Sequence, residues 1–264
     1  MRVAHSESGR AVGVLAEEGM ITRTFRGAEP PSPGRPTGHA VAVVSGGLDS
    51  TTLAYWLRVH VSRLTVLSAD YGQRHRKELD CAHATAVALG ADFRMVDLTS
   101  AGRLLGGSAL TDPGVEVPDG HYTDESMAIT VVPNRNALLL DVAVGLAAAI
   151  GADTVAFGAH RGDHAVYPDC RPVFLAAYGE MARVANEGFL PADFAVLAPF
   201  MDLAKADIVV LAGRLGVPLA ATWSCYRGGK AHCGRCGTCT ERREAFMLAG
   251  VPDPTAYADG AEVE

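Results

Sequence analysis

Short apolar runs alternate along the chain with longer segments of helical spacing. Residues 40–44 form a continuous apolar run that ends in Ser-Gly-Gly, which is typical of a buried parallel strand leading into a turn. Similar short runs predict further strands over 63–69, 92–98, 153–158 and 194–197. Apolar positions three or four residues apart predict helices over 50–61, 76–89, 136–150, 172–186, 204–215 and 240–248.

Strands that alternate with helices of this length indicate βαβ units with right-handed crossovers. We therefore predict an α/β fold with a doubly wound, mainly parallel sheet. Such folds bind ligands beyond the carboxyl ends of their strands, so the loops that follow the strands are the expected place for functional residues. Residues 100–130, rich in Gly, Pro, Asp and Thr, are predicted to form a long loop over one end of the sheet, as functional lids do.

Composition narrows the class of protein. Apolar residues make up 48% and charged residues 20% of the 264 residues, which excludes wholesale disorder. The formal net charge of −7 argues against the broad basic face that nucleic-acid binding needs. No apolar run reaches the roughly 18–20 residues of a membrane helix, and the start of the chain lacks a basic-then-apolar signal pattern. We expect a cytoplasmic protein with neither a nucleic-acid nor a membrane partner.

Three regions are expected along the chain. Pro30, Pro31, Pro33 and Pro36 break up its beginning, because proline lacks the amide hydrogen that helices and central strands use. Residues 1–38 are predicted to be a flexible leader with at most a short strand over 11–15. Residues 39–221 are predicted to form the α/β domain, and residues 222–264 a metal-binding segment with the last helix.

The loop after the first strand has the composition of an anion-binding turn. It comprises Ser45, Gly46, Gly47, Leu48, Asp49 and Ser50. Small residues let backbone N–H groups close around an anion, and the N-terminus of the next helix adds a positive dipole. The serines can donate hydroxyl hydrogen bonds, while Asp49 can cap the helix or help to hold a phosphate-bound metal. A glycine-rich turn without a ligand is the alternative interpretation.

Four cysteines gather near the end of the chain. Cys233, Cys236 and Cys239 are spaced as two Cys-x2-Cys steps, and Cys225 lies close enough to complete a set of four. Disulfides are not expected in a reducing cytoplasm. Four sulfurs suit tetrahedral zinc, and four filled positions leave no open site, so the predicted role is structural. An iron–sulfur cluster and free thiols are the alternatives.

The loop at Ser45 resembles the S-G-G-x-D-S pyrophosphate loop of the N-type ATP pyrophosphatases, which split ATP into AMP and pyrophosphate while adenylating a substrate. Together with the cysteines, residues 41–249 resemble the preQ0 synthase (QueC) family within that group. Further matching segments are 70–75 with Glu78, 132–136, 167–171, Asp202 with Lys205, and 224–226. The chain departs from the family pattern at Arg161-Gly162, where many members carry an acidic residue and Thr, and this leaves the exact acyl acceptor open.

The resemblance implies an adenine nucleotide alpha hydrolase-like fold and a ligase that uses ATP with magnesium, 7-carboxy-7-deazaguanine and ammonia. In that family the carboxylate is adenylated, ammonia displaces AMP to give an amide, and a second activation dehydrates the amide to a nitrile. The resemblance also implies structural zinc on the four cysteines and a homodimer. The alternatives are a related adenylating enzyme acting on a macromolecule or tRNA, and a non-catalytic zinc ribbon.

The resemblance also implies roles for individual residues. Ser45, Asp49, Ser50 and Lys205 are the expected catalytic residues, with Lys205 neutralising charge on pyrophosphate. ATP is expected to contact Val43, Val44, Ser45, Gly46, Gly47, Leu48, Asp49, Ser50, Arg135 and Asn136. The expected deazaguanine pocket comprises Tyr71, Gln73, His75, Asp163, Tyr167, Asp169 and Arg171. The alternatives are a helix cap with an exposed arginine at Arg135-Asn136, an exposed loop histidine at His75, and a loop-stabilising polar network at Asp169.

Overall fold

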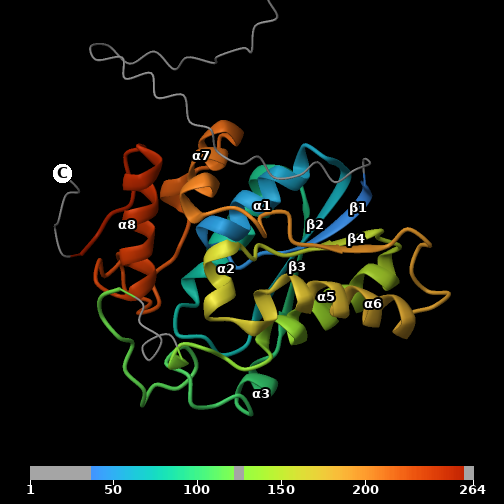
Figure 1. Ribbon diagram of the computed structural model, residues 1–264, viewed down its shortest axis with the longest axis horizontal. Helices are drawn as coiled ribbons and strands as arrows, with labels where there is room; N and C mark the ends of the chain where they lie inside the picture. The colour runs from blue at the N-terminus through green and yellow to red at the C-terminus, as the bar shows by residue number, and fades with distance from the viewer. Residues whose placement is uncertain (1–36, 122–127, 259–264) are drawn as a thin grey trace, which may run out of the picture.

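A five-stranded parallel sheet forms the centre of the protein (Figure 1). The structure, a computed structural model, describes residues 37–121 and 128–258. The strand expected over 11–15 and nearly all of the expected leader lie outside these residues. The strands are β1 (Thr37–Val43), β2 (Val61–Asp70), β3 (Asp92–Asp97), β4 (Thr154–Ala156) and β5 (Ala195–Leu197).

Helices connect the strands and confirm the predicted α/β alternation. The order of strands in the sheet is β3-β2-β1-β4-β5, so the chain reverses direction across the sheet between β1 and β4. Ligands in open parallel sheets bind at this switch point. The helices are α1 (Leu48–Arg58), α2 (Lys77–Leu89), α3 (Thr99–Gly102), α5 (Arg135–Ile150), α6 (Pro172–Ala185), α7 (Lys205–Leu215) and α8 (Gly237–Ala249).

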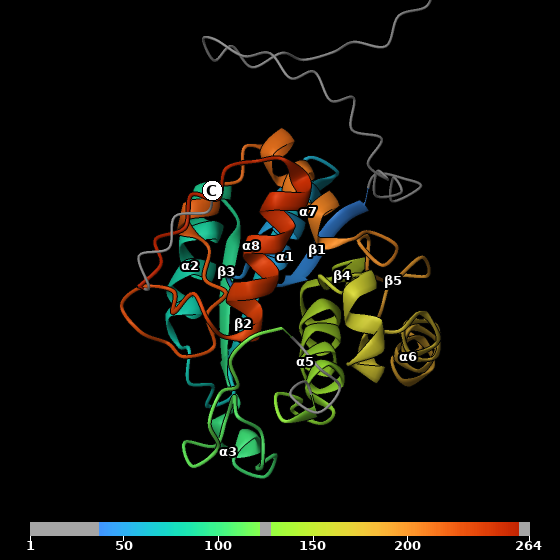
Figure 2. The ribbon, with the colours of Figure 1, turned by 60° about the vertical axis from the view of Figure 1, so that its left-hand side comes forward.

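The central strand β1 contributes to a hydrophobic core on each face of the sheet. Ala40 and Ala42 pack into the core beneath α1, α2, α7 and α8, whereas Val41 between them packs into the core beneath α5 and α6. Successive side chains of a strand point to opposite faces, and a central strand covered on both sides is therefore apolar throughout. Figure 2 shows α5 and α6 on one side of the strands, with α1, α7 and α8 on the other.

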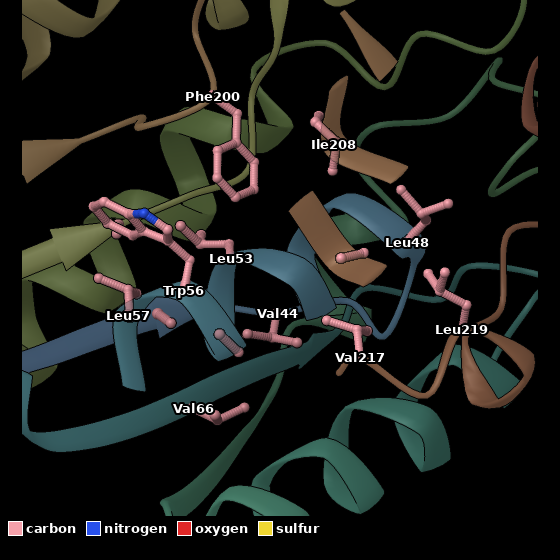
Figure 3. Close-up of a cluster of buried hydrophobic side chains, with 14 of the residues drawn as sticks. Val44, Leu48, Leu53, Trp56, Leu57, Val66, Phe200, Ile208, Val217 and Leu219 are labelled. Atoms are coloured by element: carbon pink, nitrogen blue, oxygen red, sulfur yellow. The ribbon is translucent and has the colours of Figure 1, made fainter. Parts of the chain in front are cut away.

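The larger core fixes the strand-to-helix turn that follows β1. Val44 and Leu48 flank this turn, and each is only 1% exposed. They pack with Leu53, Ile208 and other apolar side chains of α1, β2 and α7 (Figure 3). Burying a side chain of this size stabilises the fold by roughly 1.5–3 kcal/mol, so the turn is anchored at both ends.

The boundaries of several predicted elements differ from expectation. β1 begins at Thr37, inside the region predicted as a leader, and α1 begins at Leu48, two residues earlier than predicted. α8 begins at Gly237, before the last cysteine, so that Cys239 lies in its first turn. The predicted long loop contains the short helix α3. Among the described helices, none combines the length and apolarity needed to cross a bilayer.

Candidate active site

A cavity of about 250 Å³ opens beyond the carboxyl ends of the strands. Its lining comes from the loops after β1, β2 and β4, from the start of α5, and from the segment around the four cysteines. Most of the predicted nucleotide residues line it: Val43, Val44, Ser45, Gly47, Leu48, Asp49, Ser50, Arg135, Asn136 and Lys205. The fold therefore brings together side chains that lie far apart in the sequence.

The turn between β1 and α1 is organised by its two serines. The Ser50 hydroxyl accepts a hydrogen bond from the Ser45 amide at 3.2 Å and lies 3.1 Å from the Ser45 hydroxyl. The Gly47 amide donates to the Ser45 hydroxyl at 3.3 Å. No side chain of the described residues caps α1 at Gly47. The uncapped helix N-terminus and the hydroxyls together face the cavity, an arrangement that suits phosphate oxygens.

Gly46 does not line the cavity but fixes the turn against its neighbours. Its φ is +90°, and a Cβ at this position would lie 2.2 Å from the Glu78 carbonyl oxygen. On the other side, the Trp223 amide donates to the Gly46 carbonyl at 2.9 Å. The turn is thus held between α2 and the segment that precedes the cysteine cluster, and glycine is required for this close approach.

Lys205 lies in the cavity between two carboxylates. Its Nζ is 2.6 Å from an oxygen of Glu241 and 3.4 Å from an oxygen of Asp49. Burial disfavours the ammonium, but Asp49 and Glu241 outweigh this effect and raise the pKa of Lys205. Burial also disfavours the Asp49 carboxylate, yet Lys205 and His160 outweigh it and lower the pKa of Asp49. Both groups are therefore charged at neutral pH.

His160 adds a fixed hydrogen-bond donor to this cluster. The Gly162 amide donates to His160 Nδ1 at 3.1 Å, so Nε2 carries the proton in the neutral ring. Nε2 lies 3.6 Å from Asp163 and 3.9 Å from Asp49. A Cβ on residue 162 would lie 2.8 Å from His160 Cε1. The departure from the family pattern at Gly162 thus has a local reason, because only glycine leaves room for this ring.

Arg135 is enclosed in an aromatic part of the cavity. Its guanidinium lies 5.9 Å from the Tyr167 ring centroid, and Tyr71 is also close. Burial disfavours the guanidinium, but interactions with the tyrosines outweigh it and raise the pKa of Arg135. Burial raises the pKa of Tyr71 to about 12. An arginine beside tyrosine rings suits a phosphate or carboxylate anion. Arg135 is half-buried, so the exposed-arginine alternative is wrong.

The loop after β2 places His75 in the cavity wall. His75 is only 4% exposed, which contradicts the alternative of an exposed loop histidine. Its Nε2 lies 3.1 Å from Glu78, whose other oxygen accepts from the Gln73 amide at 2.9 Å. Gln73 itself does not line the cavity and acts behind His75, since its side chain also bonds the backbone of Tyr71 and Ala69.

Asp163 and Tyr167 line the cavity, whereas Asp169 and Arg171 do not. Asp169 accepts hydrogen bonds from the Asn136 amide at 3.0 Å and from the Asn136 side chain at 3.2 Å. It therefore belongs to the polar network that fixes the start of α5. Arg171 donates to the His164 carbonyl at 2.8 Å and is exposed. Neither Asp169 nor Arg171 lines the cavity, so their predicted contacts with a substrate stay predictions.

The four cysteines form a cluster that can bind a metal ion. The sulfurs of Cys225, Cys233, Cys236 and Cys239 all lie within 4.8 Å of one another. The amides of Arg235 and Cys236 donate to Cys233 Sγ at 3.5 and 3.3 Å, and the Cys233 amide donates to Cys225 Sγ at 3.3 Å. Such N–H···S bonds stabilise thiolates. A converging set of four thiols is the donor set that Zn²⁺ or an iron–sulfur cluster takes.

The cysteine segment also lines the cavity, a feature that the sequence pattern did not predict. Its lining residues are Trp223, Ser224, Tyr226, Thr238 and Glu241. Thr238 and Glu241 lie on either side of Cys239 on α8. Their spacing of three residues places them on one face of a helix. This spacing could have indicated a shared helix face in the sequence, but the helix predicted over 240–248 leaves out Thr238, whereas α8 begins at Gly237.

A family model and curated relatives match nearly all of the described chain. The family described as "Queuosine biosynthesis protein QueC" matches residues 39–250. A 7-cyano-7-deazaguanine synthase from Brucella anthropi is 55% identical over 219 residues, covering 83% of this chain and 93% of the relative. One from Rhizobium johnstonii is 56% identical, with 83% and 92% covered. A solved NH3-dependent NAD synthetase from Campylobacter jejuni aligns with a TM-score of 0.42 at 16% identity, covering 69% of this chain and 65% of that chain.

Proposed function

The chain belongs to the QueC family of queuosine biosynthesis proteins, and from this premise we propose that it makes 7-cyano-7-deazaguanine (preQ0) from 7-carboxy-7-deazaguanine, ammonia and ATP. Relatives that carry the name of this activity are more than half identical to it and matched over almost their full length. The observation that carries the proposal is the convergence, in one cavity, of the Ser45–Ser50 hydroxyls with Lys205 and Arg135.

The site suits activation of a carboxylate by ATP. A carboxylate oxygen of the substrate attacks the α-phosphorus, the bond to the β-phosphate oxygen breaks, and pyrophosphate leaves. The hydroxyls of Ser45 and Ser50 and the N-terminus of α1 bind the departing phosphates. Lys205 stabilises the charge that develops on them. Mg²⁺ accompanies ATP and offsets phosphate charge; Asp49 Oδ1, buried and without a hydrogen-bond partner among the described residues, fits it as a ligand.

The other end of the cavity suits the deazapurine and the attacking nitrogen. Tyr71, Tyr167 and Tyr226 offer faces for a planar ring. Asp163, which lies beside His160 next to the phosphate-binding cluster, offers a carboxyl group for the N–H edge of that ring. Ammonia attacks the acyl carbon, AMP leaves, and the nitrogen loses a proton to give the amide. His75, held by Glu78, is the group that accepts this proton. A second adenylation on the amide oxygen, followed by loss of AMP and of the two N–H protons, gives the nitrile.

The four cysteines are proposed to hold one structural zinc ion. The four sulfurs converge, so a zinc ion bound by all of them would have no open coordination position. Backbone N–H groups donate hydrogen bonds to two of the sulfurs. Zinc bound there would brace the segment that contributes Trp223 and Glu241 to the cavity. None of these four cysteines forms a disulfide, which fits metal binding in a reducing, cytoplasmic setting.

A homodimer is proposed on the outer face of α6. Val173 and Val184 on that helix, and Phe189 just after it, are exposed by 74%, 60% and 77%. Val173 and Val184 are eleven residues, or about three turns, apart and so lie on one face of α6. Exposed apolar side chains along one face mark an interaction site. Sedimentation velocity is expected to give a dimer for the wild type and a monomer for Val184→Asp, while a monomeric wild type would contradict the proposal.

The decisive experiment supplies the protein with ATP, Mg²⁺, ¹⁵N-ammonium and 7-carboxy-7-deazaguanine. Mass spectrometry is expected to show a nitrile with one ¹⁵N, together with AMP and pyrophosphate. Asp49→Ala is expected to abolish AMP release, whereas Asp80→Ala, an exposed carboxylate on α2, is expected to leave it unchanged. AMP without a nitrile would instead indicate another acyl acceptor. No ATP binding by calorimetry would refute the enzymatic assignment.

A further inference from the structure

Glu241 connects the cysteine segment to the phosphate end of the cavity. α8 begins at Gly237, its first turn contains Cys239, and Glu241 follows two residues later. The Glu241 carboxylate forms an ion pair with Lys205, the first residue of α7. α7 and α8 pack against each other (Figure 1). The turn that gathers the thiols therefore also sets where this carboxylate lies.

The two carboxylates beside Lys205 hold it unequally. Its Nζ is 2.6 Å from Glu241 Oε2, a hydrogen bond, but 3.4 Å from Asp49 Oδ2. Lysine has a flexible stem and roughly 2 kcal/mol of rotamer entropy, so a short charge-assisted bond decides its position. The side chains of Lys205 and Glu241 are 17% and 29% exposed, which shields the pair from water.

Without Glu241, Asp49 would be the nearest remaining anion for the lysine. Lys205 would then close on Asp49 and neutralise the carboxylate of the phosphate-binding turn. His160 does not replace Glu241, because its Nε2 proton is directed towards Asp49 and Asp163. Glu241 thus keeps the ammonium 3.4 Å from Asp49, at ion-pair distance but short of the close hydrogen bond that the ammonium makes to Glu241.

We propose that Glu241 is a positioning residue that holds Lys205 beside the pyrophosphate loop and keeps it from forming a close hydrogen bond with Asp49. The inference rests on the proposed function, since it deepens the role of Lys205 in the same site. The cysteine segment would then act in the reaction through Glu241, in addition to stabilising this side of the cavity. Misplacing a reacting group by about 1 Å can cost roughly 100-fold in rate, so Glu241→Ala is expected to slow AMP formation roughly 10- to 100-fold.

The test is a double-mutant cycle over Glu241→Ala, Lys205→Ala and the double variant. If Glu241 acts through Lys205, its loss has less than about a twofold effect once Lys205 is gone. Glu241→Gln keeps an oxygen that accepts from the ammonium, and we expect it to restore the rate to within about threefold of wild type. Glu244→Ala, an exposed glutamate on the same helix, is the matched control and is expected to change nothing.

Each outcome of the experiment decides the question. Competent sites are counted from the ATP stoichiometry in calorimetry, so misfolded protein does not mimic a slow rate. Equal effects of Glu241→Ala with and without Lys205, or failure of the glutamine to rescue, would overturn the proposal. A wild type that forms no AMP would refute the proposed function instead. In that case the same three variants are compared by their affinity for ATP. If the effects of Glu241→Ala and Lys205→Ala on this affinity depart from additivity by less than about fivefold, the inference is overturned.

Discussion

Two walls of the cavity are held in place by different forces. The wall at β1 rests on the large apolar core, with Val44 and Leu48 buried at its two ends. The other wall, residues 222–258, shares this core only through one face of α8, where Ala245, Phe246 and Ala249 pack. Around Trp223 and the cysteines it has only a small apolar cluster, and this part is held mainly by polar contacts. Arg242, 1% exposed, donates to Thr222, Ser224, Thr255 and the Leu219 carbonyl and lies 3.7 Å from Asp253.

The difference predicts how each wall responds to change. Apolar packing is non-directional, so the β1 wall should tolerate substitutions that conserve volume. Buried polar contacts are directional, and removing one partner leaves the other desolvated. The cysteine wall should therefore fail at single positions, and it should fail without unfolding the sheet. Four substitutions, taken from the largest expected effect to the smallest, examine this contrast.

Cys236→Ser should have the largest effect on the cysteine wall. A serine hydroxyl is neutral at pH 7 and a poor ligand for zinc, so metal content should fall from one per chain to near zero. Structural zinc in small modules contributes roughly 10–16 kcal/mol of apparent binding free energy. We therefore expect the segment to unfold separately, with trypsin cutting at Arg227 and Arg235 while the sheet stays folded. Elemental analysis and timed proteolysis measure both effects.

The matched control is Cys81→Ser, a half-buried thiol of α2 outside the cluster. It should keep its full metal content. Full metal content in Cys236→Ser would show that this sulfur is not a ligand. Iron in place of zinc in the wild type would favour the cluster alternative.

Arg242→Ala should destabilise the same wall by about 3–5 kcal/mol, because it leaves the buried Asp253 without its cation. Urea unfolding measures the loss. Replacing both partners, in Arg242→Met with Asp253→Leu, removes the unpaired charge and should recover part of the loss. The remainder reflects the groups that lose their hydrogen bonds to Arg242. A double variant that is simply the sum of the two losses would show that the pair does not act as a unit.

The β1 wall could be predicted from the sequence far better than the cysteine wall. The apolar run over 40–44 and the glycines after it define a strand, a turn and a helix by local rules alone. The position of the cavity then follows from a general property of parallel sheets, which bind ligands beyond the carboxyl ends of their strands. For this reason the residue pattern by itself predicts that Ser45 and Asp49 lie in the turn that lines the cavity, where the structure places them.

The cysteine wall depends on contacts that no local pattern encodes. Nothing in the sequence around Glu241 pairs it with Lys205, 36 positions earlier, and the pairing requires α7 and α8 to lie side by side. Likewise, Asp169 and Arg171 share a motif with Tyr167, yet only Tyr167 reaches the cavity. A short 3-10 turn at Pro168–Cys170 directs neighbouring side chains differently, and within it Asp169 accepts a hydrogen bond from the Asn136 amide at the start of α5.

Gly46→Ala tests the limit of tolerance in the β1 wall. Its φ of +90° and the 2.2 Å approach of a Cβ to the Glu78 carbonyl make this the one place where that wall is strict. We expect a loss of about 2–4 kcal/mol from strain and overpacking. Gly145→Ala, in open space on α5, should instead stabilise by about 0.5–1 kcal/mol. Urea unfolding of both variants measures the contrast, and equal values would contradict it.

His39 offers the smallest and most selective test, because it lies in β1 at the end away from the cavity. It is 8% exposed, with Nε2 2.9 Å from the Thr65 hydroxyl. Burial, aided by Arg63, lowers the pKa of His39 below its usual 6.5. Between the pKa of His39 in the folded protein and 6.5, the unfolded chain binds more protons than the folded protein does. The contribution of His39 to the unfolding free energy is therefore complete above pH 6.5 and is lost as the pH falls through the pKa of the folded protein. The unfolding free energy of His39→Gln should therefore fall less between about pH 7.5 and 5.5 than that of the wild type. Metal content should stay the same in both; equal acid losses would show that His39 does not contribute to the loss of stability in acid.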